Sequence, residues 1–339
     1  MTEASRVGRL PVLRTGTWIG IAVATAIAAA IPLVYSGQYV LNVLVTALIV
    51  LVLNTSWNFV LGIAGVWNFG MLAIYAIGAY GAGLVMLHTP VPAPLALLLG
   101  AAAAGAISVL LAFPTLRLFG IYTSLLTFSF AQVIQFVIVN DPYQVTGGSF
   151  GFPTVAGLFP GLDSLARIKA YYWTSLAVVI AATLAVAWIR SSRLGIALRT
   201  IRDAPAYAAA RGVDPLKYRI LAFGISGFIA GLAGALYVSY FHSVTPSIMG
   251  LTPMSIDVTM LVIGGLGTIA GPVIGTGLLT LIQELLIDYP GVQLTILGTI
   301  LLIIVVFVPG GLVGLYSRTR GRISAWVSEG EEPAPAAPG

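Results

Sequence analysis

ILAFGISGFIAGLAGALYVSYF, residues 220–241, contains no charged residue and is long enough to cross a membrane as one helix. About 20 apolar residues span the hydrocarbon core of a bilayer. Similar apolar runs recur at roughly 17–35, 39–61, 69–87, 93–113, 118–139, 172–189, 254–267, 271–287 and 292–308. The pattern predicts an all-α polytopic membrane protein with about 8–10 transmembrane helices, including broken or re-entrant segments such as the short run 254–267.

The composition supports the same class. The chain has 339 residues, of which 58% are hydrophobic and 8% are charged, whereas a soluble protein carries about a quarter charged residues. A transmembrane β-barrel would show short segments of alternating polarity, and the sequence lacks them. No polar interval is long enough for a soluble domain, so we expect one transmembrane domain over residues 17–316.

The positions of the cationic residues predict the orientation. Loops rich in Lys and Arg stay in the cytoplasm, and this accounts for the net charge of +5 without nucleic acid. Counting 254–267 as a crossing places residues 190–219 and both ends of the chain on the cytoplasmic side of the inner membrane. The cations that mark the two ends are Arg6, Arg9, Arg14, Arg318, Arg320 and Arg322.

Three segments outside the spans follow from this orientation. Residues 1–16 form a cytoplasmic N-terminus, and the loop 141–171 faces outward. Residues 317–339 form a cytoplasmic tail, whose acidic, proline-rich end predicts disorder.

The sequence gives little support for catalysis. It has no cysteine, and His88 and His242 lie at no ligand spacing from an acid or from each other, so we expect neither a disulfide nor a metal site. It contains no GxxxxGK[ST] phosphate loop, nucleophile elbow or HExxH motif. We therefore expect no enzyme activity, and any nucleotide would bind to another subunit.

One loop contains an unusual number of cationic residues and several residues that start or end helices: LGIALRTIRDAPAYAAARGVDPLKYR, residues 194–219. Leucine and isoleucine at helical spacing predict that the sixth span continues into this loop. Asp203 as a cap and Pro205 at a first turn then start a short helix that ends near Arg211, with Gly212 as a left-handed cap. A solvated, positively charged loop explains the cationic residues. An element that docks on a partner explains the helix caps and prolines. The residues alone favour neither interpretation.

Glycines mark two kinds of site in the membrane. Gly224, Gly227, Gly231 and Gly234 share one helix face, which favours a packing seam over a pore lining. The breaks at 62–65 and 264–267 are different, because paired interruptions in two halves of a chain point to a substrate path. The candidate path residues are Asn54, Trp57, Asn58, Gly62, Gly65, Asn68, Thr127, Gln132, Gly264, Gly265 and Gly267.

Interhelical hydrogen bonds and aromatic packing are the alternatives to a path. The fifth span is unusually polar, and we expect it to face the bundle interior. Three ionisable residues, Asp257, Glu284 and Asp288, fall near predicted span ends and are expected at the interface. A carrier driven by an ion gradient usually needs buried carboxylates, so energy for active transport would enter from another subunit.

Five stretches resemble one family, the branched-chain amino acid ABC-transporter permeases of the LivM type. They are LNTSWNFVLGIAGVWNFG (53–70), VTGGSFG (145–151), GIALRTIRDAPAYAAARGVDPLKYRILAFGISGFIAGLAGALYVSY (195–240), GGLGTIAGPVIG (264–275) and VPGGLVGL (308–315). They extend along the chain from residue 53 to residue 315 in the family's order.

The resemblance implies an importer with a second homologous permease subunit, two ATP-binding subunits that hold ATP and Mg²⁺, and an extracytoplasmic binding protein. It implies that Thr146, Gly147 and Gly148 take part in binding-protein docking, and that the short helix couples to the ATPase. The candidate coupling residues are Arg199, Arg202, Asp203, Ala204, Pro205, Tyr207, Ala208, Arg211 and Gly212. A urea or short-amide importer, a secondary carrier or channel, and a non-transporting scaffold remain alternatives.

Overall fold

A computed structural model describes residues 25–26, 28–32, 37–115, 118, 120–153, 157–307 and 310–314. The described part is almost entirely helical, which confirms the all-α membrane class. Its helices are α2 (Gln38–Asn58), α3 (Met71–His88), α4 (Ala93–Thr115), α5 (Ile121–Val139), α6 (Ser164–Ser191), α7 (Arg193–Asp203), α8 (Pro205–Ala210), α9 (Pro215–Phe241), α10 (Leu251–Gly264), α11 (Gly271–Leu285) and α12 (Pro290–Phe307).

Six of the described helices are long and apolar enough to cross a membrane. They are α3, α4, α5, α6, α9 and α2, which continues as a π-helix over Phe59–Ile63. The expected total of eight to ten also counted α10, α11, α12 and the span 17–35. Most of the span 17–35 lies outside the described residues. Helix α10 has 14 residues and packs against α11 in a hairpin, as its short apolar run predicts.

The glycine face of α9 forms the predicted packing seam. A Cβ at Gly231 would overlap Ala104, and one at Gly234 would overlap the carbonyl oxygen of Tyr75. These contacts bring α9 against α4 and α3 with almost no side chain between the backbones. Because small residues let membrane helices approach closely, the seam holds the centre of the bundle together.

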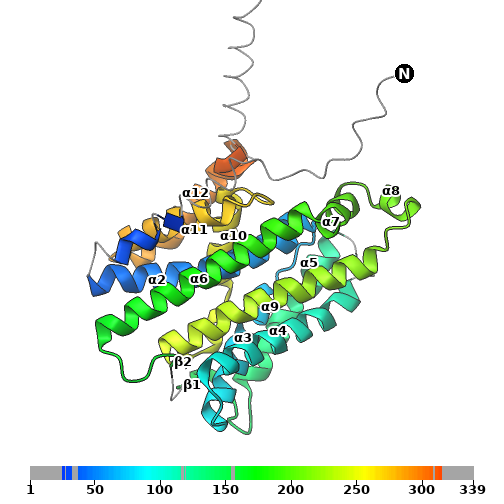
Figure 1. Ribbon diagram of the computed structural model, residues 1–339. Helices are drawn as coiled ribbons and strands as arrows, with labels where there is room; N and C mark the ends of the chain where they lie inside the picture. The colour runs from blue at the N-terminus through cyan, green and yellow to red at the C-terminus, as the bar shows by residue number, and fades with distance from the viewer. Residues whose placement is uncertain are drawn as a thin grey trace, which may run out of the picture.

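The two ends of the bundle differ (Figure 1). Helices α7 and α8 lie at one end, and the short strands β1 (Phe152–Pro153) and β2 (Ser243–Val244) lie at the opposite end. The strands pair antiparallel, with Phe152 opposite Val244. Helix α9 connects the two ends, so it runs the length of the bundle. We refer to these as the α8 end and the strand end.

The sixth span does not extend into the following loop, and that prediction is wrong. The chain takes an extended conformation at Ser192 and then starts α7 as a separate helix. The hydroxyls of Ser191 and Ser192 donate to the carbonyl oxygens of Trp188 and Ile189, at 2.9 and 2.7 Å. Serine that bonds to preceding carbonyls competes with the helical ladder, and this ends α6.

Residues 1–16 and 317–339 lie outside the described part of the chain. The expected cytoplasmic N-terminus and disordered tail therefore stay predictions, as do the boundaries of the transmembrane domain.

Candidate functional site

Helix α8 forms where the sequence predicts it. Pro205 occupies its first turn, and Gly212 follows its end with φ +74°. The N–H of Gly212 donates to Ala209 O, and that of Val213 donates to Ala208 O, both at 3.0 Å. These bonds satisfy the last carbonyls of the helix, as a left-handed cap does.

The two faces of α8 have different surroundings. The side chain of Ala208 is fully buried, whereas Tyr207 is 55% exposed. The guanidinium of Arg211 lies 5.2 Å from the centre of the Tyr207 ring, a cation–π distance. The helix thus presents an aromatic and cationic face to its surroundings at the α8 end.

Asp203 does not cap α8, contrary to the sequence prediction. The capping position is Ala204, and no side chain bonds to the first turn. The Asp203 carboxylate instead accepts hydrogen bonds from Arg202 Nε at 2.7 Å and Nη2 at 3.2 Å. These bonds lower the pKa of Asp203 below its ordinary value. Asp214 does cap α9, because its carboxylate accepts the N–H of Leu216 at 3.0 Å.

Two arginines among the candidate coupling residues bond to backbone carbonyl oxygens of this chain. Arg199 donates to the carbonyl oxygens of Gly195 and Arg190, at 3.1 and 3.0 Å. Arg202 donates through Nη1 to the carbonyl oxygen of Gly62. Its aliphatic stem lies against Gly65, where a Cβ would overlap it. Arg202 therefore joins α7 to the break that follows α2.

The two predicted glycine breaks meet in space, and a third glycine segment joins them. Gly62 lies against Gly267, and Gly265 lies against Gly311, so closely that a Cβ on Gly62 or Gly311 would overlap the neighbouring backbone. We call Gly62, Gly65, Gly265, Gly267 and Gly311 the glycine junction. Four of them, all except Gly62, have positive φ angles between 65° and 110°, a region that glycine adopts without steric cost.

Asn58 connects the two sides of the junction. Its Nδ2 donates to Thr268 O at 2.7 Å, and its Oδ1 accepts the N–H of Gly267 at 2.8 Å. A buried polar backbone without water needs such partners. Asn58 thus holds the turn between α10 and α11 against the end of α2.

The remaining path candidates on α2 and α10 are also buried. Asn54 donates to Thr276 Oγ1 at 3.0 Å, which links α2 to α11. Trp57 is fully buried and packs edge-on against Phe69, with ring centroids 6.5 Å apart. Gly264 lies against the backbone of Gly271 where α10 meets α11. These contacts are the interhelical packing that the sequence left open as an alternative.

Thr127 and Asn68 order the segment between α2 and α3. The N–H of Phe69 donates to Thr127 Oγ1 at 3.0 Å, and the N–H of Gly70 donates to Asn68 Oδ1 at 2.9 Å. Thr127 thereby joins α5 to the first break. All the candidate path residues except Gln132 belong to this connected interior.

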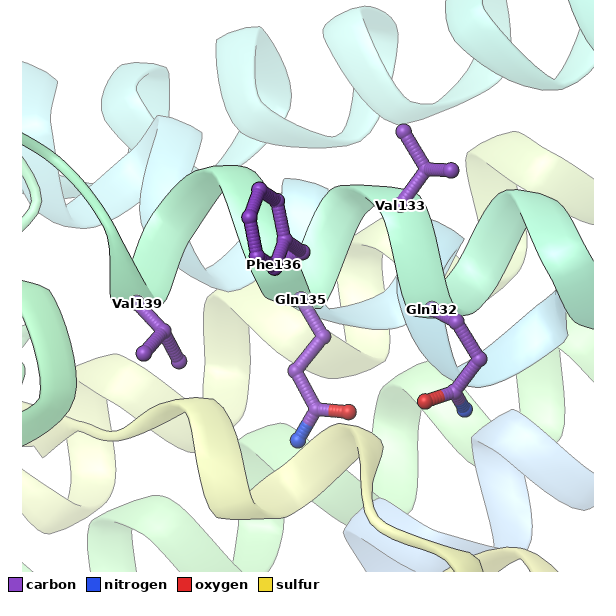
Figure 2. Close-up of a pocket in the computed structure, with 5 residues that line it drawn as sticks. All are labelled: Gln132, Val133, Gln135, Phe136 and Val139. Atoms are coloured by element: carbon purple, nitrogen blue, oxygen red, sulfur yellow. The ribbon is translucent and has the colours of Figure 1, made fainter.

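Gln132 lies apart from the others. It lines an open groove of 470 Å³ on α5 together with Val133, Gln135, Phe136 and Val139, and Figure 2 shows both glutamine side chains on one side of the helix. Helix α5 does not face the interior as expected, since only four of its residues are buried: Thr123, Thr127, Ala131 and Ile138. Leu126, Phe130 and Ile134 are partly buried against the core, whereas Val133 and Phe136 are exposed.

One acidic residue is placed differently from the prediction. The sequence predicts Asp257 near a span end, but it lies in the middle of α10 and is only 7% exposed. The difference arises because α10 begins at Leu251 and not at residue 254. Glu284 lies near the end of α11, where it accepts a hydrogen bond from the Tyr39 hydroxyl.

The three docking candidates form one tight loop at the strand end. The carboxylate of Asp141 accepts the N–H of Thr146 at 2.6 Å and its hydroxyl at 2.8 Å. Gly147 and Gly148 have positive φ angles, and a Cβ at Gly147 would overlap the carbonyl oxygen of Gly151. The loop is therefore a preformed structure that precedes β1.

The Asp141 bonds predict a pH dependence of this loop. They lower the pKa of Asp141 below its ordinary value of 3.8, the Thr146 N–H contributing most. A carboxyl with a lowered folded pKa stabilises the fold above its unfolded pKa, and this stabilisation is lost as the pH falls through the folded value. We expect hydrogen exchange of residues 141–151, corrected for intrinsic rates, to accelerate below about pH 4.

A matched pair of variants tests the assignment. Asp141→Asn should exchange fast already at neutral pH and lose the pH dependence, because a neutral amide is a weaker acceptor for these donors. Asp163→Asn is the control, since the Asp163 side chain makes no capping bond to α6. Equal protection in the Asp141→Asn variant and the wild type would contradict the role of the carboxylate.

The sequence points to four of the five junction residues and misses Gly311. The glycines of VPGGLVGL are visible in the sequence. Their proximity to Gly265 depends on how α12 brings the chain back to the end of α10, and no local pattern specifies this. Thr268 and Thr276 are missed for the same reason: the backbone carbonyl oxygen of Thr268 and the hydroxyl of Thr276 bond to asparagines more than 200 positions away in the sequence.

These features describe a polytopic membrane protein in which Arg202 of α7 connects the glycine junction to the region of the short helix α8. The chain belongs to the family described as branched-chain amino acid transport system, permease component, whose model matches residues 39–309. No solved structure matches the chain.

Three relatives show what the chain is similar to. The high-affinity branched-chain amino acid transport system permease protein LivM of Escherichia coli is 26% identical over 84% of this chain and 72% of its own length. The ribose import permease protein RbsC of Haemophilus influenzae is 24% identical over 85% and 87%. The probable branched-chain amino acid transport permease protein LivH of Methanocaldococcus jannaschii is 34% identical over 39% and 42%.

Proposed function

We propose that this chain is the transmembrane subunit of an ABC importer that moves branched-chain aliphatic amino acids across the cytoplasmic membrane, with ATP and Mg²⁺ bound by partner subunits. The observation that carries the proposal is the family match over residues 39–309, which includes both α8 and four residues of the glycine junction. A transport permease subunit of this kind has no enzyme activity of its own.

The two ends of the bundle suit different partners. The exposed Tyr207 and Arg211 face of α8 is suited to docking in an ATP-binding subunit, so the α8 end would face the cytoplasm. The cationic residues near both termini support the same side for the ends of the chain. The preformed loop with Thr146, Gly147 and Gly148 lies at the opposite end (Figure 1), where an extracytoplasmic binding protein would deliver substrate. The conformational change that ATP binding causes in the ATP-binding subunits is then transmitted through α8 to the helices between the two ends.

The exposed face of α5 supports a path between two permease subunits. Phe136 and Val133 are exposed there, but Gln132 and Gln135 share the same groove (Figure 2). Gln135 Nε2 donates to Pro246 O at 3.3 Å, whereas the Gln132 amide has no partner among the described residues. An amide group in hydrocarbon requires a hydrogen-bond partner, so lipid alone is a poor neighbour for Gln132. A homologous second subunit that packs along α5 would enclose the groove, and the glutamines would supply polar contacts for a zwitterion.

Reconstitution with separate substrates tests the function. The chain is purified with its second permease subunit, ATP-binding subunits and binding protein, and uptake of leucine, ribose and urea into liposomes is measured. We expect ATP-dependent uptake of leucine above the other two. Preferred ribose uptake, as the name of the RbsC relative suggests, would overturn the substrate, and ATP-independent uptake by the chain alone would overturn the importer.

Asp257 allows a sharper test of the rival mechanism, a carrier driven by an ion gradient. A buried membrane carboxylate is the usual site of proton or cation coupling, and Asp257 is such a group. If ATP supplies the energy, Asp257→Asn should retain at least about half of the uptake, because the amide has the same shape and needs no charge. Glu284→Gln serves as the control, and loss of uptake restricted to Asp257→Asn would favour ion coupling.

A further inference from the structure

We propose that Arg202 is the positioning residue through which a displacement of α7 and α8 reaches the glycine junction. The inference rests on the proposed function, because it explains how a partner that pushes on α8 moves the interior. It assigns Arg202, which is an exposed residue, a contact with Gly62 of this chain, whereas the family resemblance includes it among the candidates for coupling to the ATPase.

The first step is the position of the side chain. Arg202 lies in the last turn of α7, and Ala204 alone separates α7 from α8. Its side chain is 36% exposed, and the Nη1 donor lies on the carbonyl oxygen of Gly62. A guanidinium on a helix-terminal carbonyl is a charge-assisted bond, stronger than a neutral one, so α7 and the end of α2 are expected to move together.

The second step is the rigidity of the side chain. The Arg202 carbons lie against Gly65 in space that any Cβ there would occupy. Asp203 holds the other guanidinium nitrogens at 2.7 and 3.2 Å, and this two-point geometry fixes the plane of the group. An arginine held on both sides transmits a displacement of its own helix, whereas a free arginine would only rotate.

The third step is the route beyond Gly62. Gly62 touches Gly267 through backbone atoms, and Asn58 bonds to both Gly267 and Thr268. The turn between α10 and α11 is therefore packed directly against the residue whose carbonyl group Arg202 holds. Backbone contacts without intervening side chains cannot absorb a shift by a change of rotamer, so the α10–α11 turn must follow Arg202.

The test measures coupling in the full complex. In Arg202→Gln, we expect the number of leucine molecules moved per ATP hydrolysed to fall about tenfold. Arg193→Gln is the matched control, because Arg193 lies on the same helix with an exposed side chain. A ratio in Arg202→Gln equal to that of the wild type would overturn the inference, whereas absent ATP-driven uptake in the wild type would overturn the proposed function.

A second readout separates transmission from stability. The chain contains no cysteine, so Ala270→Cys at the exposed turn before α11 provides one labelling site. Its maleimide reaction rate should differ between the nucleotide-free and ATP-bound complexes, and Arg202→Gln should abolish this difference. If Arg202→Gln fails to assemble, Arg202→Lys should still lower the ratio at least threefold, and an unchanged ratio or labelling difference overturns the inference.

Discussion

Gly62→Ala is expected to abolish most of the uptake and to lower the thermal stability of the chain. A Cβ at residue 62 would overlap both the nitrogen and the Cα of Gly267 and would also lie within 3 Å of the Asn58 amide oxygen. The overlapped atoms of Gly267 belong to a backbone with φ +74°, so the neighbour cannot change rotamer to make room. Overpacking at sites that can relax costs about 1–3 kcal/mol, and this site has less freedom.

The loss should extend beyond the local clash. Separating Gly62 from Gly267 also breaks the Asn58 bond to the Gly267 N–H, which leaves a buried donor without a partner at a cost of about 1–3 kcal/mol. We expect an apparent melting temperature several degrees lower in detergent, by about 2–4 °C per kcal/mol, and uptake reduced at least tenfold. Fluorescence-detected unfolding and liposome uptake measure the two effects.

A control on the same hairpin separates this clash from a general effect of alanine. Gly277 lies on α11, and a Cβ at this position would meet no atom within 4 Å. Alanine is also the better helix former by about 1 kcal/mol. Gly277→Ala should therefore leave uptake and melting temperature unchanged or slightly raised. Wild-type uptake and stability in Gly62→Ala would show that the glycine junction is not closely packed during transport.

The features that the sequence predicts well are those with local signals. Pro205, Gly212 and the Asp214-Pro215 start fix their own turns through restricted φ angles and short-range hydrogen bonds, so α8 and the start of α9 can be placed from neighbouring residues alone. The α9 seam is equally predictable, because glycines at a spacing of three or four share a helix face whatever they contact.

The features that it predicts poorly depend on partners distant in the chain. Asn58 is recognisable as a polar residue in a membrane span, but the sequence does not indicate that it bonds to residues more than 200 positions away. Arg202 resembles a surface cation because its acceptor is a backbone carbonyl, which leaves no mark in a sequence. The exposure of α5 is missed for another reason: polar residues indicate a protein neighbour, and the pattern does not say whether that neighbour is in the same chain.

Gly212→Pro is expected to uncouple ATP hydrolysis from uptake while the chain still inserts into the membrane. Gly212 has φ +74°, whereas proline is fixed near about −65°. Proline also removes the N–H that donates to Ala209 O at 3.0 Å. The last turn of α8 must therefore open, and the exposed Tyr207 and Arg211 face loses its geometry.

The size of the effect follows from the forced change in the φ angle of residue 212 and from the loss of its N–H hydrogen bond. A backbone forced out of its native conformation costs about 1–3 kcal/mol, and an isolated helix of 6 residues has no stability of its own to offset this cost. Because every 1.4 kcal/mol is a factor of about ten in population, we expect at least a tenfold lower uptake per ATP hydrolysed. The measurement compares both rates in the same liposomes, after equal insertion has been verified by immunoblot.

The surroundings of Gly212 make the interpretation direct. An added Cβ there meets nothing within 4 Å, so a side chain by itself causes no clash. Asparagine adopts left-handed conformations more readily than other residues with a side chain, and Gly212→Asn should keep at least about half of the coupled uptake. If Gly212→Asn and Gly212→Pro lose coupled uptake equally, the identity of the residue at this position matters to the partner, and the backbone conformation of α8 does not. In that case α8 does not transmit force as a rigid helix.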